Sequence, residues 1–454
     1  MDLAPLRAIV GAEHVLAPVP RAYREDASAS RGISGSGACV VRPVDAEQVA
    51  AVVAHCYERG IAIVPRGGGS GFSGGAVAAP DEVVLSLERL NRVRALEPER
   101  WRMHVEAGVT TATVQRLARE NGCFYPPDPG APEQSQIGGN LATNAGGPHT
   151  FKYGVTRSWV TGVEAVLAPG ELVQLGGPLR KDAAGYDLRG LLIGSEGTLG
   201  VITAAWLRLV PAPESAAALL AAYPDTAAGT EALSAVLGSG VVPAVLEYLD
   251  GGAVRAAAGA FPGELAGDPG LVVIAEVDGS EAEVAAAAGE IAAALAPRAL
   301  SVHEFRSAAE LQALWRWRGG ASLAVTAQRG GKLSEDICVP IERLGEAIEA
   351  TLRIGARHDL EACSWGHAGD GNLHSTFLLD PGDAAQQERA KEAAHELFEL
   401  ALALGGTISG EHGIGLAKSG WLRRQWAPAA IAAHEAVKQA LDPRGLFNPG
   451  KKQP

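Results

Sequence analysis

Residues 61–71 read Ile-Ala-Ile-Val-Pro-Arg-Gly-Gly-Gly-Ser-Gly, a short apolar run that leads directly into a glycine-rich loop. The apolar run 61–64 predicts a buried strand. In the loop, successive backbone N–H groups without side chains can form a concave nest for a phosphate, to which Arg66 adds positive charge. A tight surface turn uses the same residues, so this loop alone leaves both interpretations open. The Lys-Ser/Thr ending of a Walker loop is absent and no clear helix follows the glycines, which argues against those two nucleotide-binding motifs.

The sequence around this loop predicts a mixture of helices and strands. A helix is expected to begin after Asp45 and to end at Gly60, because Asp caps helix N-termini and Gly favours the left-handed conformation that ends helices. Ser280 and Glu283 have the spacing of a capping box at the start of an Ala-rich helix. We expect further strands at 83–87 and 271–274, and further helices at 342–357 and 383–404. An Ala-rich texture from about 215 to 300 places a domain boundary near residue 212.

Composition and charge limit the classes of protein to consider. Of the 454 residues, 47% are hydrophobic and 20% are charged, which is typical of a globular protein and excludes disordered and collagen-like chains. The net charge of −13 argues against nucleic acid as a partner, because no overall basic surface is available for a phosphate backbone. The five cysteines are widely spaced and odd in number, which argues against a disulfide framework and a zinc ribbon.

The location of the protein is predicted from what the sequence lacks. The N-terminal residues have no basic segment followed by an apolar core, so we expect no signal peptide. No stretch reaches the ~18 apolar residues of a membrane-spanning helix. We therefore expect a cytoplasmic protein, and peripheral association with a membrane face stays open. The cysteines are then interpreted as small buried side chains in a reducing compartment.

Further loops rich in Gly and Asn follow the first one. They lie at residues 126–129, 136–147, 185–188 and 194–202. Loops of this composition can lay backbone amides along an extended ligand that is longer than a single phosphate.

A second pattern is the segment 365–374, Trp-Gly-His-Ala-Gly-Asp-Gly-Asn-Leu-His. It predicts a hairpin with residues 369–372 as the turn. Because side chains alternate along a strand, folding brings His367 and His374 near each other on one face. Two imidazoles held in this way suit a divalent cation. Two hydrogen-bonded structural histidines would give the same pattern, so the pair alone leaves the choice open.

A third pattern is the segment 410–415, Gly-Glu-His-Gly-Ile-Gly. Glu411 could complete a site of two histidines and one carboxylate, with positions left for substrate. The adjacent His412 would then be a proton acceptor that does not bind the metal. A hydrogen-bonded loop histidine is the alternative for His412.

In combination these motifs resemble the D-lactate, D-2-hydroxyglutarate and glycolate dehydrogenase family, which includes the FAD subunit of glycolate oxidase. This family is part of the vanillyl-alcohol oxidase / p-cresol methylhydroxylase flavoprotein superfamily. The resemblance extends from residues 23–28 to residues 447–451. It implies an α+β fold with a PCMH-type FAD-binding domain of two α/β subdomains at 1–212. It also implies a substrate-binding cap domain with an antiparallel sheet flanked by helices at 213–420, and a C-terminal segment, 421–454, that returns to the FAD domain.

The resemblance implies that FAD is bound in an extended form. Relatives that attach flavin covalently often carry a His in the first glycine loop; this chain has none there, so we expect dissociable FAD. The first loop is expected to hold the pyrophosphate, and the later loops and the C-terminal segment the remainder. The implied cofactor-binding residues are Arg66, Gly67, Gly68, Gly69, Ser70, Gly71, Pro127, Asp128, Gly138, Gly139, Asn140, Thr143, Asn144, Gly146, Glu196, Gly200, Ile202 and Asn448.

The resemblance also implies roles for residues of the second and third patterns. It implies that His367, His374 and Glu411 bind zinc or manganese and that His412 is the catalytic base. Asn372 and Arg318 are implied to bind substrate, with Arg318 on its carboxylate; a surface arginine lying over Trp317 is the alternative.

The implied reaction is oxidation of a D-2-hydroxy acid to the 2-oxo acid. D-2-hydroxyglutarate dehydrogenases carry a Lys close before the Asp of this segment, Asp336, at the place where this chain has Ser334. Lys332 lies two residues away, and whether it has the same backbone direction stays open. We therefore favour D-lactate, glycolate or a longer monocarboxylic acid. The alternatives are a carbohydrate or alditol oxidase on the same flavin fold, and an electron-relay subunit of a glycolate oxidase-like complex.

The partners implied by the resemblance are a small 2-hydroxy acid and an electron acceptor. The acceptor stays open among a quinone, an electron-transfer flavoprotein, a cytochrome and oxygen. The oligomeric state stays open between a homodimer and a glycolate oxidase-like complex.

Overall fold

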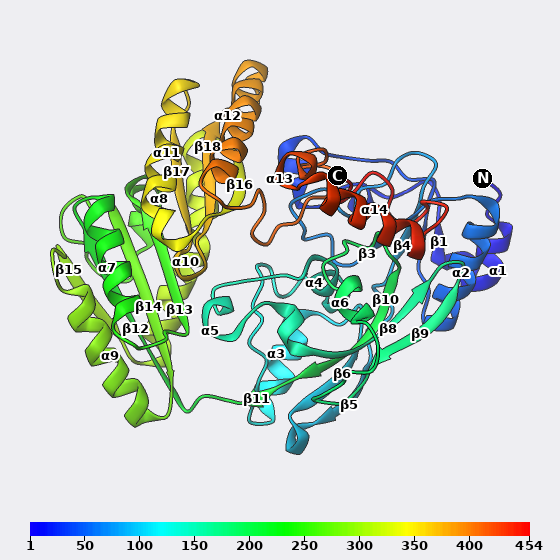
Figure 1. Ribbon diagram of the computed structural model, residues 1–454, viewed down its shortest axis with the longest axis horizontal. Helices are drawn as coiled ribbons and strands as arrows, with labels where there is room; N and C mark the ends of the chain where they lie inside the picture. Colours follow the sequence, from blue (N-terminus) through cyan, green and yellow to red (C-terminus); the bar gives the residue numbers. More distant parts are fainter. The chain divides into compact units, whose positions relative to one another are not determined.

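The glycine-rich loop follows a parallel strand. In the computed structural model, which describes residues 1–454, β3 (Ile63–Arg66) ends where the loop begins. A four-stranded sheet has the order β1 (Val15–Leu16), β2 (Cys39–Val41), β4 (Val83–Ser86), β3, and its last three strands are parallel (Figure 1). α2 (Ala46–Arg59) begins after Asp45, whose carboxylate accepts from Gln48 N, and ends at Gly60 in the left-handed conformation. The predicted cap and end of this helix are therefore confirmed.

A second sheet, of five antiparallel strands, follows in the chain. Its order is β5 (Val93–Glu97), β6 (Arg102–Glu106), β10 (Val201–Arg208), β8 (Val160–Leu167), β9 (Glu171–Gly176). Glu106 on β6 and Glu164 on β8 are buried on either side of β10 and are neutralised by Arg92 and Arg94. The two sheets give this part of the chain the two subdomains that the sequence predicts.

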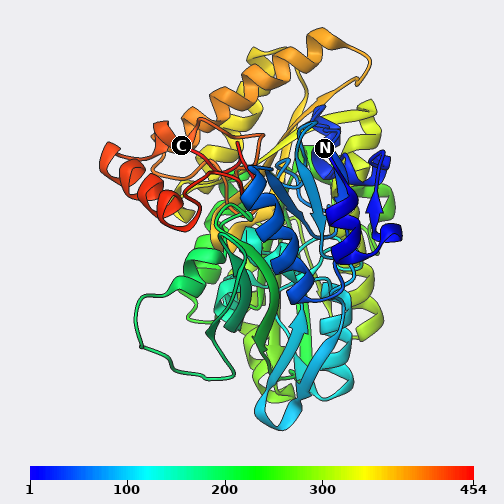
Figure 2. The ribbon, with the colours of Figure 1, turned by 90° about the vertical axis from the view of Figure 1, so that its right-hand side faces the viewer.

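The C-terminal segment completes the four-stranded sheet. Ile63 and Phe447 form a parallel bridge, and Asn448 N donates to Ile63 O at 2.8 Å. Phe447 is fully buried in the core formed by α2, β2 and β4, so residues more than 380 positions apart share one hydrophobic cluster. In Figures 1 and 2 this segment, in red, runs beside the blue strands of the first sheet. The predicted return of the C-terminus to this domain is therefore observed.

A seven-stranded sheet, antiparallel at every pairing, follows residue 212. Its order is β15 (Ser301–Phe305), β12 (Ser215–Tyr223), β14 (Leu271–Gly279), β13 (Val245–Asp250), β17 (Ala362–His367), β18 (Asn372–Leu379), β16 (Gly331–Cys338). Strands β13 and β17 are neighbours although more than one hundred residues separate them in the sequence. This non-consecutive pairing decides which side chains meet on the sheet.

Helices pack on both faces of the seven-stranded sheet. α8 (Gly251–Ala257) and α10 (Ala308–Arg329) pack on the face that carries Leu249 and Trp365. α11 (Leu344–Arg357) lies on the opposite face, where Thr351 and Ser375 exchange a hydrogen bond of 2.9 Å. The capping box of Ser280 and Glu283 is present at the start of α9 (Glu281–Leu295), as predicted. The predicted strand 271–274 is part of β14, and the predicted helix 383–404 is α12 (Ala384–Ala403).

The remaining elements are short or connect the sheets. The α-helices are α1 (Ala4–Val10), α3 (Thr111–Glu120), α4 (Ile137–Thr143), α5 (Thr150–Tyr153), α6 (Leu188–Leu192), α7 (Thr226–Gly238), α13 (Leu422–Gln425) and α14 (Pro428–Leu441). β7 (Cys123–Phe124) pairs with β11 (Val210–Pro211). The 3₁₀ turns are Ala12–His14, Arg21–Tyr23, Ala27–Arg31, Pro98–Arg100, Thr156–Trp159, Ala258–Ala260, Ile341–Arg343 and Ala368–Asp370. None of the helices combines the length and apolar character needed to cross a membrane.

The chain divides into two compact units. The first consists of residues 1–147, 154–212 and 411–454, and the second of residues 148–153 and 213–410. The change at 212/213 coincides with the boundary expected from the sequence. The chain re-enters the first unit at Glu411, earlier than the expected 420.

The short insertion 148–153, here called the clip, was not predicted. It interrupts the sequence of the first unit but packs with the second. Lys152 forms an ion pair with Asp278 on β14, and Tyr153 OH donates to the same carboxylate at 2.6 Å. A Cβ on Gly369 would collide with the ring of Phe151, so the clip also contacts the turn that follows His367. One carboxylate, Asp278, therefore holds two of the six clip residues.

Replacing Asp278 with Ala is expected to free the clip. Loss of two charge-assisted contacts should weaken local docking by about 1–2 kcal/mol, which raises the open population roughly tenfold. Limited trypsin digestion should then cut after Lys152 faster than in the wild type. The control is Asp268→Ala, whose carboxylate pairs only with the exposed Arg255. Equal cutting rates after Lys152 in the Asp278 variant and the wild type would show that this carboxylate does not hold the clip.

Candidate functional site

The predicted histidine hairpin is present. Strands β17 and β18 pair antiparallel, with Trp365 opposite His374 and His367 opposite Asn372. The two imidazole rings are 5.4 Å apart between centroids and nearly perpendicular, at 87°. Both histidines are buried. The sequence therefore predicted the shared face of the two imidazoles correctly.

Glu411 joins the two histidines. One ligand atom of each residue, His367, His374 and Glu411, lies within 4.8 Å of the others. The position of Glu411 is set by the residues before it, because Thr407 forms a bridge with Cys338 and Gly410 N donates to Asp336 O on β16. Two imidazoles and one carboxylate at this spacing are a donor set that suits zinc or manganese. The residues present therefore fit a divalent ion.

A glutamate that the sequence analysis did not single out lies behind His367. Glu247 is paired with His367 in the register of β13 and β17, and its Oε1 contacts the Nδ1 of that imidazole. Its other oxygen forms an ion pair with Arg318. Burial raises the pKa of this fully buried carboxyl, but Arg318 and His367 outweigh burial and hold the pKa below its usual value. The only signal in the sequence was a lone Glu inside the apolar run 245–249.

Arg318 lies on α10, on the face that packs against this part of the sheet. Only 9% of the residue is exposed, so the alternative of a surface arginine over Trp317 does not hold. Trp317 instead donates to Ala257 O and packs against Phe261. One amino group of the guanidinium is bound to Glu247, whereas its Nε is buried without an acceptor. A buried donor without a partner is rare, so this atom fits an acceptor brought by a ligand.

Asn372 also has a buried polar atom without a hydrogen-bond partner. Its Nδ2 donates to Ile337 O at 2.8 Å, and its Oδ1 is buried without a partner. Gly410 lies so close to this carboxamide that a Cβ there would collide with it. The side chain of Asn372 is therefore fixed, and its free oxygen can accept one hydrogen bond from a bound molecule.

Lys332 shares the orientation of Ser334. Both belong to β16 at a spacing of two residues, so their side chains point to the same face of the sheet. A different direction of the Lys332 side chain, which the sequence left open, does not occur because the strand is regular here. Lys332 Nζ donates to Ser322 O at 2.6 Å and lies 5.0 Å from the centroid of the Trp365 ring. No carboxylate pairs with this ammonium group.

Two glycines in the glycine-rich loops of the first unit have open space beside them. A Cβ on Gly71 or Gly139 would meet no atom within 4 Å, so packing alone does not require glycine at either position. The carboxamide oxygen of Gln136 and the hydroxyl of Tyr125 are buried in this unit without hydrogen-bond partners. Because buried polar atoms normally have partners, these residues fit a polar ligand such as an extended dinucleotide.

The side chain of Arg66 is bound by backbone carbonyl groups beside the first glycine loop. Its Nη2 donates to Ala22 O at 2.7 Å and to Glu25 O at 2.9 Å, and its Nη1 to Ala76 O at 3.4 Å. The guanidinium is thus used to hold two backbone segments together. The guanidinium also lies against Gly69 of the loop, so its contribution of positive charge to a phosphate site stays a prediction.

Other cofactor residues expected from the resemblance also hold the fold. Asn140 Nδ2 donates to Thr111 Oγ1 at 2.6 Å, and Asn144 Oδ1 accepts from Arg157 N at 2.9 Å. All of the expected cofactor residues lie in the first unit. They are residues 66–71, Pro127, Asp128, Gly138, Gly139, Asn140, Thr143, Asn144, Gly146, Glu196, Gly200, Ile202 and Asn448.

Glu196 and Asn448 connect the C-terminal segment to these loops. The Glu196 carboxylate accepts from Ile414 N at 2.9 Å and from Gly415 N at 2.7 Å. Asn448 Nδ2 donates to Glu196 O at 2.7 Å and to Gly75 O at 2.9 Å. These bonds fix the loop 413–415 directly after His412.

His412 packs on an aromatic side chain next to the first glycine loop. Its ring lies 4.7 Å from that of Phe72 between centroids, at 32° between planes. Phe72 follows Gly71 and is 48% exposed, and the sequence analysis did not consider it. The predicted base and the predicted phosphate loop therefore meet through Phe72 within the first unit.

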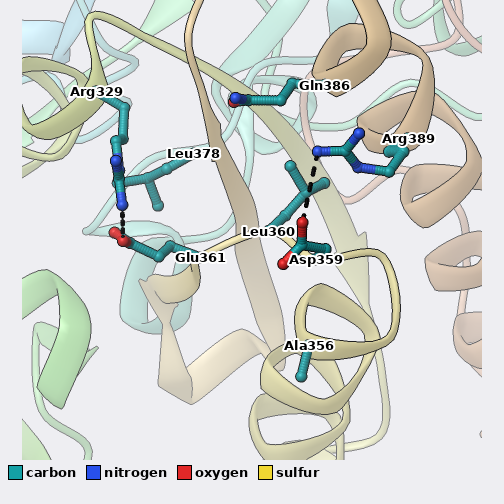
Figure 3. Close-up of a pocket in the computed structure, with 8 residues that line it drawn as sticks. All are labelled: Arg329, Ala356, Asp359, Leu360, Glu361, Leu378, Gln386 and Arg389. Carbon is teal, nitrogen blue, oxygen red and sulfur yellow. Dashed lines mark hydrogen bonds and ion pairs between the residues drawn. The ribbon is translucent and has the colours of Figure 1, made fainter.

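A hollow elsewhere in the second unit is a poor candidate for a site. It has a volume of about 400 Å³ and is lined by Arg329, Glu361, Gln386 and Arg389 among others (Figure 3). Arg329 is paired with Glu361, and Arg389 with Asp359 at 3.9 Å. Its cations are thus already neutralised by exposed carboxylates, and no cluster of metal ligands lines it.

Comparison with known families and proteins agrees with this arrangement. Residues 37–176 match the model of an FAD binding domain, and residues 212–452 match that of the C-terminal domain of FAD linked oxidases. The chain is 37% identical to the glycolate oxidase subunit GlcD of Bacillus subtilis, covering 91% of this chain and 88% of that protein. It is 33% identical to the D-lactate dehydrogenase of Anaerostipes hadrus over 99% and 95% of the two chains. The D-2-hydroxyglutarate dehydrogenase of Xanthomonas citri pv. viticola is 37% identical, over 91% and 88%.

Solved structures support the fold. A p-cresol methylhydroxylase with bound substrate aligns with a TM-score of 0.77 at 17% identity, covering 99% of this chain and 95% of that one. The 4-ethylphenol oxidase from Gulosibacter chungangensis gives 0.77 at 20% identity over 99% and 96%. The predicted α+β fold of the PCMH type is therefore confirmed.

Replacing Arg66 with Met is expected to destabilise the protein before any flavin is added. Three backbone carbonyls lose a charged donor in a buried place, which should lower the free energy of unfolding by about 2–4 kcal/mol. Urea unfolding of the flavin-free protein measures this difference. The control is Arg21→Met, whose side chain is exposed and pairs only with Glu25. Unchanged stability together with weakened FAD binding would instead place the guanidinium on the phosphate.

Proposed function

Because this chain belongs to the family of FAD-linked oxidases, we propose that it oxidises a D-2-hydroxy acid such as D-lactate or glycolate with the help of a divalent metal ion. The observation that carries the proposal is the convergence of His367, His374 and Glu411 within 4.8 Å. An alditol or carbohydrate oxidase needs no such set of metal ligands. An electron-relay subunit needs no buried arginine whose N–H group lacks an acceptor.

The reaction removes the hydroxyl proton and a hydride from the same carbon of the substrate. Bound FAD supplies the hydride acceptor, and a zinc or manganese ion on His367, His374 and Glu411 would lower the pKa of the substrate hydroxyl. His412 accepts the hydroxyl proton on an imidazole nitrogen. Arg318 binds the substrate carboxylate through its unpaired Nε, and Asn372 Oδ1 orients the substrate by accepting one hydrogen bond.

Alanine in place of His367 or Glu411 is expected to abolish both metal binding and substrate oxidation. Loss of one ligand of three should weaken the site by more than about a hundredfold. Metal analysis and the anaerobic loss of oxidised-flavin absorbance with a panel of D- and L-2-hydroxy acids measure the two effects. The control is His358→Ala, because His358 pairs with Glu396 outside the site.

Two results would contradict the proposal. Retention of metal and flavin reduction in either ligand variant would exclude the metal centre. A wild-type protein whose flavin is reduced by alditols and by no 2-hydroxy acid would favour the alternative oxidase.

A second candidate substrate is a dicarboxylic 2-hydroxy acid. Lys332 is the observation that favours it, since its ammonium group lies on the same sheet face as His374 and has no carboxylate partner. Burial lowers the pKa of Lys332 to about 8. A distal carboxylate on the substrate would neutralise this buried charge. The identity of 37% to a D-2-hydroxyglutarate dehydrogenase is compatible with this candidate.

Lys332→Met distinguishes the two candidates. If the substrate is dicarboxylic, kcat/KM for D-2-hydroxyglutarate should fall by about a hundredfold, because a buried charged hydrogen bond is lost, while kcat/KM for D-lactate stays nearly constant. In the wild type, kcat/KM for the dicarboxylate should decrease as pH rises through about 8, since Lys332 loses its proton there. Lys391→Met, at an exposed residue paired with Glu388, is the control. Equal effects of Lys332→Met on both substrates would leave the monocarboxylic acid as the substrate.

A further inference from the structure

Glu247 contacts two groups with different proposed roles. Its Oε1 faces Nδ1 of His367, and its Oε2 faces an amino group of Arg318. The residue is fully buried and sits in the middle of β13, where its backbone is fixed by strands on both sides. No other carboxylate pairs with Arg318.

We propose that Glu247 is a positioning residue that orients the metal ligand His367 and the substrate-binding Arg318 with a single carboxylate. This inference rests on the function proposed above. It goes beyond that function because it makes metal affinity and substrate affinity depend on one residue that itself binds neither.

The contact with His367 decides which imidazole nitrogen faces the ion. An Nδ1 that donates its hydrogen to a carboxylate leaves Nε2 unprotonated and available as a metal ligand. The strand register keeps this arrangement, since Glu247 and His367 are directly opposed. A carboxylate behind a ligating histidine also increases the basicity of the ring.

The contact with Arg318 decides which part of the guanidinium is left for substrate. With one amino group bound to Glu247, the buried Nε has no acceptor. The planar guanidinium is held by this ion pair, so its remaining donors point in fixed directions. Without Glu247, the arginine would lose both its orientation and the neutralisation of its buried charge.

Glu247→Gln tests the inference with two independent measurements. The amide keeps the size of the side chain but turns a donor toward Arg318 and removes the negative charge behind His367. We expect the dissociation constant for Zn²⁺ or Mn²⁺, measured by competition with a chromophoric chelator, to rise about tenfold or more. We expect KM for the hydroxy acid at saturating metal to rise as well, with a smaller change in kcat. Arg318→Met should raise KM alone and leave metal affinity unchanged.

The matched control is Glu106→Gln. Glu106 is also fully buried and paired with arginines, but it lies in the first unit and contacts no proposed ligand. Its loss should lower the melting temperature without changing metal affinity or KM. If Glu247→Gln does the same, Glu247 is only structural and the inference is overturned.

A double variant keeps the test valid if Glu247→Gln folds poorly. Glu247→Gln combined with Arg318→Met contains no unpaired buried arginine, and its metal dissociation constant should still exceed that of Arg318→Met alone. Equal constants would overturn the inference. A wild-type protein that binds no divalent ion would instead contradict the proposed function, so the two failures are distinguishable.

Discussion

A glutamate carboxylate in the middle of a sheet must be neutralised, and the groups that neutralise Glu247 are the ones that the proposed chemistry uses. Removing a charge from water costs several kcal/mol, which is recovered only with well-placed partners. Arg318 on α10 and His367 on β17 are those partners. The same requirement that stabilises the centre of the second unit therefore fixes the positions of a proposed metal ligand and of a proposed substrate-binding cation.

The register of the sheet carries this arrangement. His367, His374 and Lys332 come from three strands and share one face, because side chains alternate along each strand. A shift by one residue in any of these strands would move its side chain to the opposite face, where α11 packs. The bridge between Thr407 and Cys338 extends the sheet edge and brings the chain to Glu411. The donor set is thus a consequence of strand pairing more than of local loop conformation.

Local sequence signals predicted the local structure well. Asp45, Gly60 and the Ser280 capping box gave helix ends correctly, because each signal acts within one turn of backbone. The histidine hairpin was predictable for the same reason. Glu247 was not, because its partners lie 71 and 120 residues away and meet it only through non-consecutive strand order. The hydrogen bonds of Arg66 to three backbone carbonyls were not predictable either, because no sequence pattern reveals them.

The charge balance of this sheet face explains how an acidic chain can bind an anionic substrate. The chain carries a net charge of −13, which by itself repels carboxylates. On the face that carries the histidines, the negative charge of Glu247 is balanced by Arg318, and Lys332 has no carboxylate partner. The buried Asp336 lies opposite His374 and adds a negative charge. With the proposed divalent ion, Glu411 would cancel only part of the added positive charge. In a buried place these local charges outweigh the distant surface charges, because solvent screens them little. Attraction of the substrate is therefore a property of a few buried side chains, which is why composition alone could not reveal it.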